Sequence, residues 1–275
     1  MPTKDPFKIS DHVADFAEIS KRYSERSAQT LARHPHQLDI SYGNNAAEQL
    51  DLIYPKNLTQ GAPVHMFIHG GYWRSGSKAD YSYMAEPVIA SGGIAVLVDY
   101  PLMPQARMPQ LVAQVRRAMA WVKHHIADHG GDAQRITASG HSAGAHLASY
   151  LAATGPQDQE QAQSVQKLVL VSGIYDLALI PESFLQPEIG LTWNEVENWS
   201  PLDADHDANV DRIIVVGGNE TRPFHTQAEE FQALLPESDG NLRILPGLDH
   251  MSIILEMGDP NTDAGQILAD VVANS

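Results

Sequence analysis

The sequence predicts an α/β fold with a mostly parallel sheet of eight strands and helices on both faces. From about residue 63 onward, short β-rich runs alternate with helical patterns, which is typical of a parallel sheet covered by helices. Residues 94–98 are apolar at every position, as expected of a strand buried on both faces. The first two runs, 37–42 and 48–54, are separated by the turn-forming residues 43–45, which predicts an antiparallel hairpin at the sheet edge.

The other elements follow from the apolar periodicity. Six further strands are expected at residues 64–68, 94–98, 136–138, 168–171, 213–216 and 242–245. Helices are expected at residues 11–32, 109–129, 143–154, 223–235, 253–257 and 264–273. In residues 109–129, for example, apolar residues recur at spacings of three and four, and two glycines follow the end of the pattern.

The length of 275 residues admits one large domain or two small ones. We expect a single domain over residues 1–275, because the alternation of strands and helices continues without a low-complexity tract. Residues 1–36 are expected to form a helical segment that braces the domain or covers it as a lid. Residues 177–209 interrupt the alternation with three prolines and two tryptophans, so we expect a small cap insertion over the strand ends.

Composition excludes several classes of function. The chain has 18 Lys and Arg against 34 Asp and Glu, a formal net charge of −16, and such a surface repels phosphate backbones and anionic lipids. Nucleic acid and membranes are therefore not expected as partners, and no apolar run is long enough to span a bilayer. There is no cysteine, so covalent chemistry must use another nucleophile. The first residues lack the apolar region of a secretory signal, which predicts a cytoplasmic location.

Residues 140–144 read Gly-His-Ser-Ala-Gly and lie between a predicted strand and a predicted helix. The G-x-S-x-G nucleophile elbow requires this context, because its turn is so sharp that side chains two residues before and after the serine would clash. Ser142 is therefore the candidate nucleophile. The alternative is a serine in an ordinary glycine turn.

Residues 69–73, His-Gly-Gly-Tyr-Trp, follow the predicted strand 64–68 and precede the elbow. Glycines let main-chain amides approach a developing oxyanion, and the amide of Ala143 at a helix start can supply a second donor. The sequence therefore predicts an oxyanion hole between this loop and the elbow.

A serine hydroxyl needs a base, and the base needs a third group that fixes its tautomer. Glu220 and His250 both follow predicted strands, at the strand ends where open α/β sheets place their sites. The chain order Ser142, Glu220, His250 is the Ser…acid…His order typical of this architecture.

Other polar residues have simpler explanations. Asp176 is the best alternative acid, although a turn role in support of the insertion explains it better. Asp249 would have to fold back on its own neighbour to orient His250. His141 is expected to point away from Ser142 and to pack or line the pocket. The histidine pairs of the chain lack a zinc-binding pattern, and no phosphate-binding or dinucleotide-binding glycine motif is present, so no metal and no cofactor are expected.

These residues resemble the α/β-hydrolase fold, and within it the esterase and kynurenine formamidase (arylformamidase) branch, whose oxyanion loop reads His-Gly-Gly-Tyr-Trp or close to it. The resemblance covers nearly the whole chain and includes residues 38–43, 69–73, 99–100, 140–144, 172–177 and 249–250. It implies a cofactor-independent serine hydrolase with Ser142 as nucleophile, His250 as base and Glu220 as acid, and with Gly70, Gly71 and Ala143 as oxyanion donors. The chain departs from the family at Glu220, where formamidases usually have Asp.

The resemblance implies an arylformamidase, which converts an aromatic formamide such as N-formylkynurenine to the free amine and formate. A carboxylesterase acting on small acyl esters is the first alternative, and a non-catalytic binding protein is the second. The expected partner is a small-molecule substrate with an aromatic leaving group, and a homodimer is compatible with the sequence.

A broad pocket is needed for an aromatic leaving group. Tyr72, Trp73, Tyr175 and Trp193 are the candidates for its lining, and packing in the core is an equal alternative for each of them. Arg74 and Arg222 are candidates for binding a substrate carboxylate, although an arginine of this kind is more often a solvated surface charge.

Overall fold

A computed structural model describes residues 4–158, 165–235 and 241–275 of the chain. An eight-stranded sheet in the order β1-β2-β4-β3-β5-β7-β9-β10 forms the centre of the molecule. Its strands are β1 (His36–Ser41), β2 (Gln49–Ile53), β3 (Ala62–Ile68), β4 (Ile94–Val98), β5 (Gly131–His141), β7 (Lys167–Val171), β9 (Asp211–Gly217) and β10 (Leu242–Leu245). A small antiparallel sheet pairs β6 (Ala153–Thr154) with β8 (Asp205–His206).

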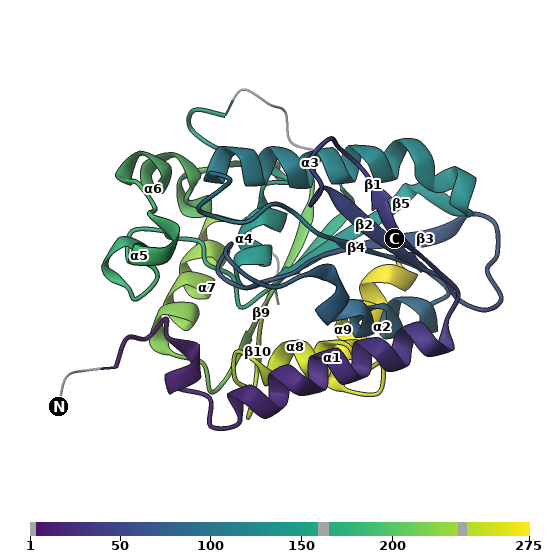
Figure 1. Cartoon of the computed structure of the whole chain (residues 1–275), viewed down its shortest axis with the longest axis horizontal. Helices are drawn as coiled ribbons and strands as arrows, with labels where there is room; N and C mark the ends of the chain where they lie inside the picture. The colour runs from purple at the N-terminus through teal and green to yellow at the C-terminus, as the bar shows by residue number, and fades with distance from the viewer. Residues whose placement is uncertain (1–3, 159–164, 236–240) are drawn as a thin grey trace.

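The helices lie on both sides of the sheet, with α3 on one side and α1, α2, α8 and α9 grouped on the other (Figure 1). Their bounds are α1 (Phe16–Arg33), α2 (Ala85–Ala90), α3 (Met108–His125), α4 (Ala143–Ser149), α5 (Gln186–Ile189), α6 (Trp193–Trp199), α7 (Arg222–Leu234), α8 (Ser252–Met257) and α9 (Asp263–Ala273). Short 3₁₀ turns are η1 (Ile9–Asp11), η2 (Lys78–Met84), η3 (Ile126–His129), η4 (Ile180–Glu182) and η5 (Pro201–Asp203). None of the helices in the described ranges combines the length and apolar character that crossing a membrane requires.

The predicted fold class is confirmed. Strand β1 pairs antiparallel with β2, and β2 pairs antiparallel with β4, whereas neighbouring strands from β4 to β10 are parallel. All residues of β4 are buried, as its continuous apolar run predicts, and all residues of β3 are buried as well, including His65. Each of the eight predicted strands is present in this one sheet.

Several helical predictions differ from the structure: α1 begins at Phe16 and not at residue 11, and α3 ends at His125 and is followed by the 3₁₀ turn η3. The helix expected over residues 143–154 ends at Ser149, and the chain then turns into β6. Helix α2 was not predicted, because its six residues include a proline and are too few to show a period. The insertion 177–209 contains η4, α5, α6, η5 and β8, and the N-terminal segment contains η1 and α1, which runs beside α8 (Figure 1).

Candidate active site

Ser142 lies at the sharp turn between β5 and α4, with backbone angles φ 57° and ψ −121°. A non-glycine residue in this region costs on the order of 1–3 kcal/mol, which the surrounding packing must offset. A Cβ atom on Gly140 would lie 2.1 Å from the carbonyl oxygen of Gly144, and one on Gly144 would lie 2.1 Å from the carbonyl oxygen of Ile68. The two glycines therefore let the elbow close against itself and against the end of β3.

Glu220 and His250 form a close pair. Nδ1 of His250 lies 2.7 Å from Oε2 of Glu220, whose side chain is fully buried. Since Nδ1 faces a carboxylate, it carries the hydrogen, and Nε2 of the neutral ring is left to accept a proton. His250 also packs against the ring of Phe224, at a centroid distance of 4.4 Å.

The other carboxylate oxygen of Glu220 is held by two donors. Oε1 accepts hydrogen bonds from Ser172 Oγ at 2.5 Å and from the Gly217 amide at 2.8 Å. Ser172 follows β7 and has a positive φ of 49°, so its backbone is strained where its side chain meets the carboxylate. Sequence reasoning did not single out Ser172 for this contact. A polar residue after a strand end was its only signal.

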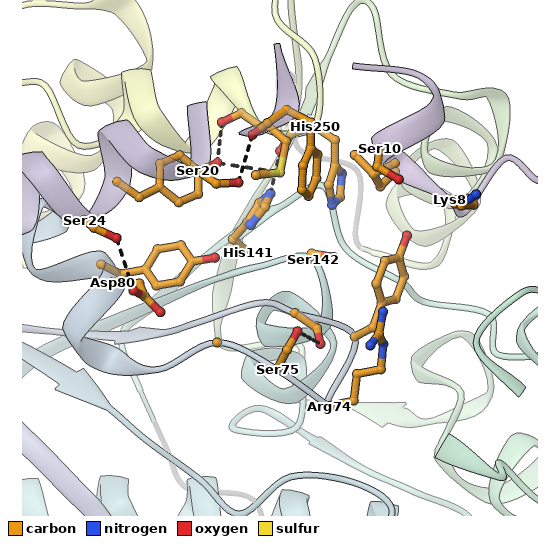
Figure 2. A pocket seen from close by; sticks show the side chains of 18 of the residues that line it. Lys8, Ser10, Ser20, Ser24, Arg74, Ser75, Asp80, His141, Ser142 and His250 are labelled. Carbon is orange, nitrogen blue, oxygen red and sulfur yellow. Dashed lines mark hydrogen bonds between the residues drawn. The ribbon is translucent and has the colours of Figure 1, made fainter. Parts of the chain in front are cut away.

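Ser142 and His250 line one cavity of about 650 Å³, which we call the central cavity. In Figure 2, Lys8, Ser10, Ser20 and Ser24 from the N-terminal segment lie on one side of Ser142, and Arg74 and Ser75 from the loop after β3 lie on the other. The remaining lining residues are Ile9, Phe16, Tyr23, Gly71, Tyr72, Gly76, Asp80, Tyr81, His141, Phe184, Glu188 and Met251. The structure thus brings the three predicted residues together, because Glu220 contacts His250 and His250 shares this cavity with Ser142.

The glycine-rich loop passes directly over the elbow. A Cβ atom on Gly70 would lie 3.2 Å from Cβ of Ser142, and one on Gly71, where φ is 110°, would lie 2.1 Å from the carbonyl oxygen of Ser75. Ala143 is the first residue of α4, so its amide lies at the positive end of the helix. Gly70 of the loop therefore lies against Ser142, and Ala143 follows Ser142 at the start of α4.

His69 contacts the backbone of this loop through its buried side chain. Its ring is buried and stacked on Tyr100 at a centroid distance of 4.5 Å, and its Nδ1 lies 2.7 Å from the carbonyl oxygen of Gly70. Its Nε2 lies 3.4 Å from Oδ1 of Asp99, and that oxygen also accepts the amide of Lys78 at 2.6 Å.

One of the four aromatic residues predicted for the pocket lines the central cavity. Tyr72 does so, and its hydroxyl donates to the carbonyl oxygen of Phe7 at 2.5 Å. Trp73 is fully buried, with Nε1 3.3 Å from Nδ1 of His146, and Tyr175 is buried in a stack with Phe231. Trp193 lies on the surface of α6, 58% exposed. These three residues fill the core or face solvent.

The other aromatic residues that line the central cavity were not predicted. Phe16, Tyr23, Tyr81 and Phe184 line it, and sequence reasoning did not identify them. For Phe16 and Tyr23 in α1, helix periodicity gives the apolar face of the helix but not the cavity that this face covers. Tyr81 lies in the 3₁₀ turn η2 and Phe184 lies in a turn before α5, where no apolar period is available.

The alternative acids occupy turns, as the simpler explanations predict. Oδ1 of Asp176 accepts the amide of Ala178 at 2.8 Å. Oδ1 of Asp249 accepts the amides of Met251 and Ser252 at 2.9 and 2.8 Å, before α8 begins. No group of three or more histidine and carboxylate side chains suited to a metal ion occurs in the described part of the chain.

Of the two candidate arginines, Arg74 lines the central cavity and Arg222 does not. Arg222 is exposed and lies outside the central cavity. Arg74 lines the cavity, where its Nη1 lies 2.5 Å from Oε2 of Glu188 and its guanidinium lies 5.8 Å from the ring centre of Phe184.

Comparison with known proteins shows the family of the chain. Residues 50–197 match the family BD-FAE. The chain belongs to the BD-FAE family. It is 30% identical to a kynurenine formamidase of Salmo salar over 97% of this chain and 90% of that protein. It is 33% identical to the esterase LipC of Mycobacterium tuberculosis over 52% of this chain and 38% of that protein.

The fold of this BD-FAE family member is shared with solved esterases. An esterase structure from Pyrobaculum calidifontis superposes with a TM-score of 0.71 at 18% identity, covering 97% of this chain and 95% of that one. The chain therefore has the α/β-hydrolase fold, and the sequence relatives named above are hydrolases.

Proposed function

We propose that this chain is a serine hydrolase of the arylformamidase type, which removes a formyl group from an aromatic amine. The observation that carries the proposal is the buried Glu220–His250 pair, 2.7 Å apart, which shares the central cavity with a serine on a strained elbow. A neutral imidazole whose Nδ1–H is bound by a carboxylate is the base that a serine nucleophile needs.

The proposed reaction has two halves. Ser142 Oγ attacks the formyl carbon while His250 Nε2 takes the hydroxyl proton, and Glu220 stabilises the imidazolium that forms. Amides of Gly70, Gly71 and Ala143 bind the oxyanion, each donor being worth about 3–4 kcal/mol of transition-state stabilisation. The C–N bond then breaks, His250 returns the proton to the amine, and water repeats the cycle on the formyl ester to release formate.

Cavity size supports an aromatic formamide as substrate. A formyl group fills little of about 650 Å³, so the leaving group would occupy most of the space. Phe16, Tyr23, Tyr72, Tyr81 and Phe184 supply apolar walls for a ring. The similarity to the Salmo salar kynurenine formamidase over nearly the whole chain supports the same assignment.

A carboxylesterase acting on small acyl esters is the second candidate. The acid Glu220 and the similarity to the esterase LipC favour it. The third alternative, a non-catalytic binding protein, has no use for the strained elbow and the buried acid–base pair together.

The deciding experiment compares kcat/KM for N-formylkynurenine, formanilide and p-nitrophenyl acetate, with the Ser142→Ala variant as the control. We expect the wild-type protein to hydrolyse the formamides in preference to the ester and the variant to hydrolyse neither. Ester hydrolysis without measurable deformylation would assign the chain to the carboxylesterases.

A further inference from the structure

His141 is the last residue of β5 and precedes Ser142, yet the proposed reaction gives it no role. Its side chain is almost completely buried on the wall of the central cavity. Nε2 of His141 lies 2.9 Å from the backbone carbonyl oxygen of His250, and the two imidazole rings pack with centroids 4.7 Å apart. Figure 2 shows this contact as a dashed line leading from the His141 ring toward the His250 segment.

The partner of His141 fixes its tautomer. A carbonyl oxygen only accepts hydrogen bonds, so Nε2 carries the hydrogen and donates it. Burial, together with the neighbouring His250, lowers the pKa of His141 well below its usual value of 6.5, which keeps the ring neutral. Nδ1 is then unprotonated. It has no hydrogen-bond partner among the described residues, and a Cβ atom on Gly70 would lie 3.2 Å from it.

The His141 ring therefore lies between two parts of the site. One nitrogen holds the backbone of the base, and the other faces the glycine loop that covers the elbow. Glu220 fixes the imidazole of His250 through Nδ1, but a side-chain contact alone leaves the backbone of residue 250 free to shift. His250 follows β10 in the short segment before α8, where the contact from β5 ties it to the elbow strand.

We infer that His141 is a positioning residue for the base: it donates a hydrogen bond from Nε2 to the His250 carbonyl and thereby sets the His250 ring relative to Ser142. The inference rests on the proposed serine hydrolase function. It assigns His141 no direct contact with the reacting atoms. A neutral ring at this place also lets His250 accept a proton without a like charge beside it.

Three substitutions at position 141 test the inference. His141→Gln places an amide nitrogen near the position of Nε2, so it keeps the donor to the carbonyl of His250. His141→Asn is also polar but too short to reach that carbonyl, and His141→Leu keeps bulk without a donor. The measurements are kcat and KM for formanilide and p-nitrophenyl acetate, and the rate at which a fluorophosphonate modifies Ser142. Thermal unfolding of each variant checks that it is folded.

We expect His141→Leu and His141→Asn to lower kcat and the phosphonylation rate about 100-fold with KM little changed, as misplacement of a reacting group does. His141→Gln should recover most of both rates. The far-downfield proton resonance of the His250–Glu220 hydrogen bond should shift in the Leu and Asn variants but not in the Gln variant. A purely structural role would not produce this pattern.

Two results would overturn the inference: wild-type rates in the Leu and Asn variants, or equal losses in the Gln and Asn variants. If His141→Leu does not fold, the comparison of Gln with Asn still decides. The proposed substrate can fail separately, because a wild-type protein that hydrolyses only the ester still allows every comparison to be made on the ester.

Discussion

The carboxylate of Glu220 is the most constrained charged group of the site. It is fully buried and receives hydrogen bonds from Ser172, Gly217 and His250. A buried carboxylate in this position orients the base and stabilises its cationic form. Because donors contact both oxygens of the carboxylate, the group is held in one orientation.

Substitutions at Glu220 and at Asp176 test which of the two carboxylates is the acid that orients His250. Glu220→Gln should lower kcat by several orders of magnitude, because the amide neither stabilises an imidazolium nor enforces the correct tautomer. Asp176→Asn should change kcat less than about threefold, since Asp176 accepts one turn amide. Steady-state kinetics of both variants make the comparison. The reverse ranking would transfer the role of acid to Asp176.

At Arg74, we expect the guanidinium to bind a carboxylate on the leaving group. Arg74→Gln should raise KM for N-formylkynurenine about 10-fold or more and leave KM for formanilide, which has no carboxylate, nearly unchanged. Glu188→Gln is the matched control, because it removes the acidic partner of Arg74 without removing the cation. Equal effects of Arg74→Gln on both substrates would contradict a carboxylate-binding role.

Among the elements, the order of strand β5, the elbow at Ser142 and helix α4 was predictable, although α4 ends at Ser149 and not at residue 154. Its glycine spacing and its position after an apolar run are both local features of the sequence. The walls of the central cavity were not predictable, because Phe16 and Tyr23 come from α1, far from the elbow in sequence. Trp73 and Tyr175 were expected in the pocket but are core residues, since sequence order does not fix the direction of a side chain at a strand end.

The N-terminal segment also connects elements that surround the site. Oδ2 of Asp5 accepts a hydrogen bond from the amide of Phe184. The carbonyl oxygen of Pro6 accepts a hydrogen bond from the hydroxyl of Thr221. The carbonyl oxygen of Phe7 accepts a hydrogen bond from the hydroxyl of Tyr72. These contacts join residues 177–209, the loop that follows Glu220 and the glycine-rich loop after β3. A local reading of the sequence predicts the helix but not these connections.

The elbow can be tested at Gly144. In an open helix, Gly→Ala gains up to about 1 kcal/mol of stability from helix propensity. At Gly144 the new Cβ would lie 2.1 and 2.5 Å from the carbonyl oxygens of Ile68 and His69, so we expect a loss of about 2 kcal/mol or more and a lower kcat. Urea unfolding and steady-state kinetics measure the two effects.

Gly190→Ala is the control for this change. Gly190 has a positive φ of 56°, and no atom lies within 4 Å of the added Cβ. The stability of Gly190→Ala therefore measures only the free-energy cost of an alanine at positive φ, without a steric clash. We expect about 1–2 kcal/mol of destabilisation there with no change in kcat. A stabilised, fully active Gly144→Ala variant would show that the elbow is not closed against β3.

For the whole molecule, buried neutral histidines make stability depend on pH. Burial lowers the pKa of His65 to about 3 and that of His146 to about 4, and it lowers the pKa of His141 as well. In the unfolded chain these rings take up protons below pH 6.5, whereas in the folded chain they stay neutral, so stability is present above pH 6.5 and is lost as the pH falls toward 3.

His65 and His146 should each remove about 2 kcal/mol of folding free energy at pH 5, where these rings are protonated in the unfolded chain and neutral in the folded chain. Urea unfolding at pH 7 and at pH 5 gives the free energy of unfolding at each pH, and the difference between them is the sum of these contributions. His146→Gln should reduce that difference. Equal stability at pH 7 and pH 5 would show that these histidines are charged in the folded protein or that other groups compensate for them.

The central claim is that Ser142 becomes a nucleophile only when the His250–Glu220 pair is intact. The most direct measurement is mass spectrometry of the folded protein after reaction with a fluorophosphonate, for the wild type and for the Ser142→Ala and His250→Ala variants. We expect one adduct per chain, on Ser142, no adduct in Ser142→Ala, and labelling slowed by several orders of magnitude in His250→Ala. An unlabelled wild-type protein that still turns over substrate, or turnover that survives Ser142→Ala, would contradict the claim.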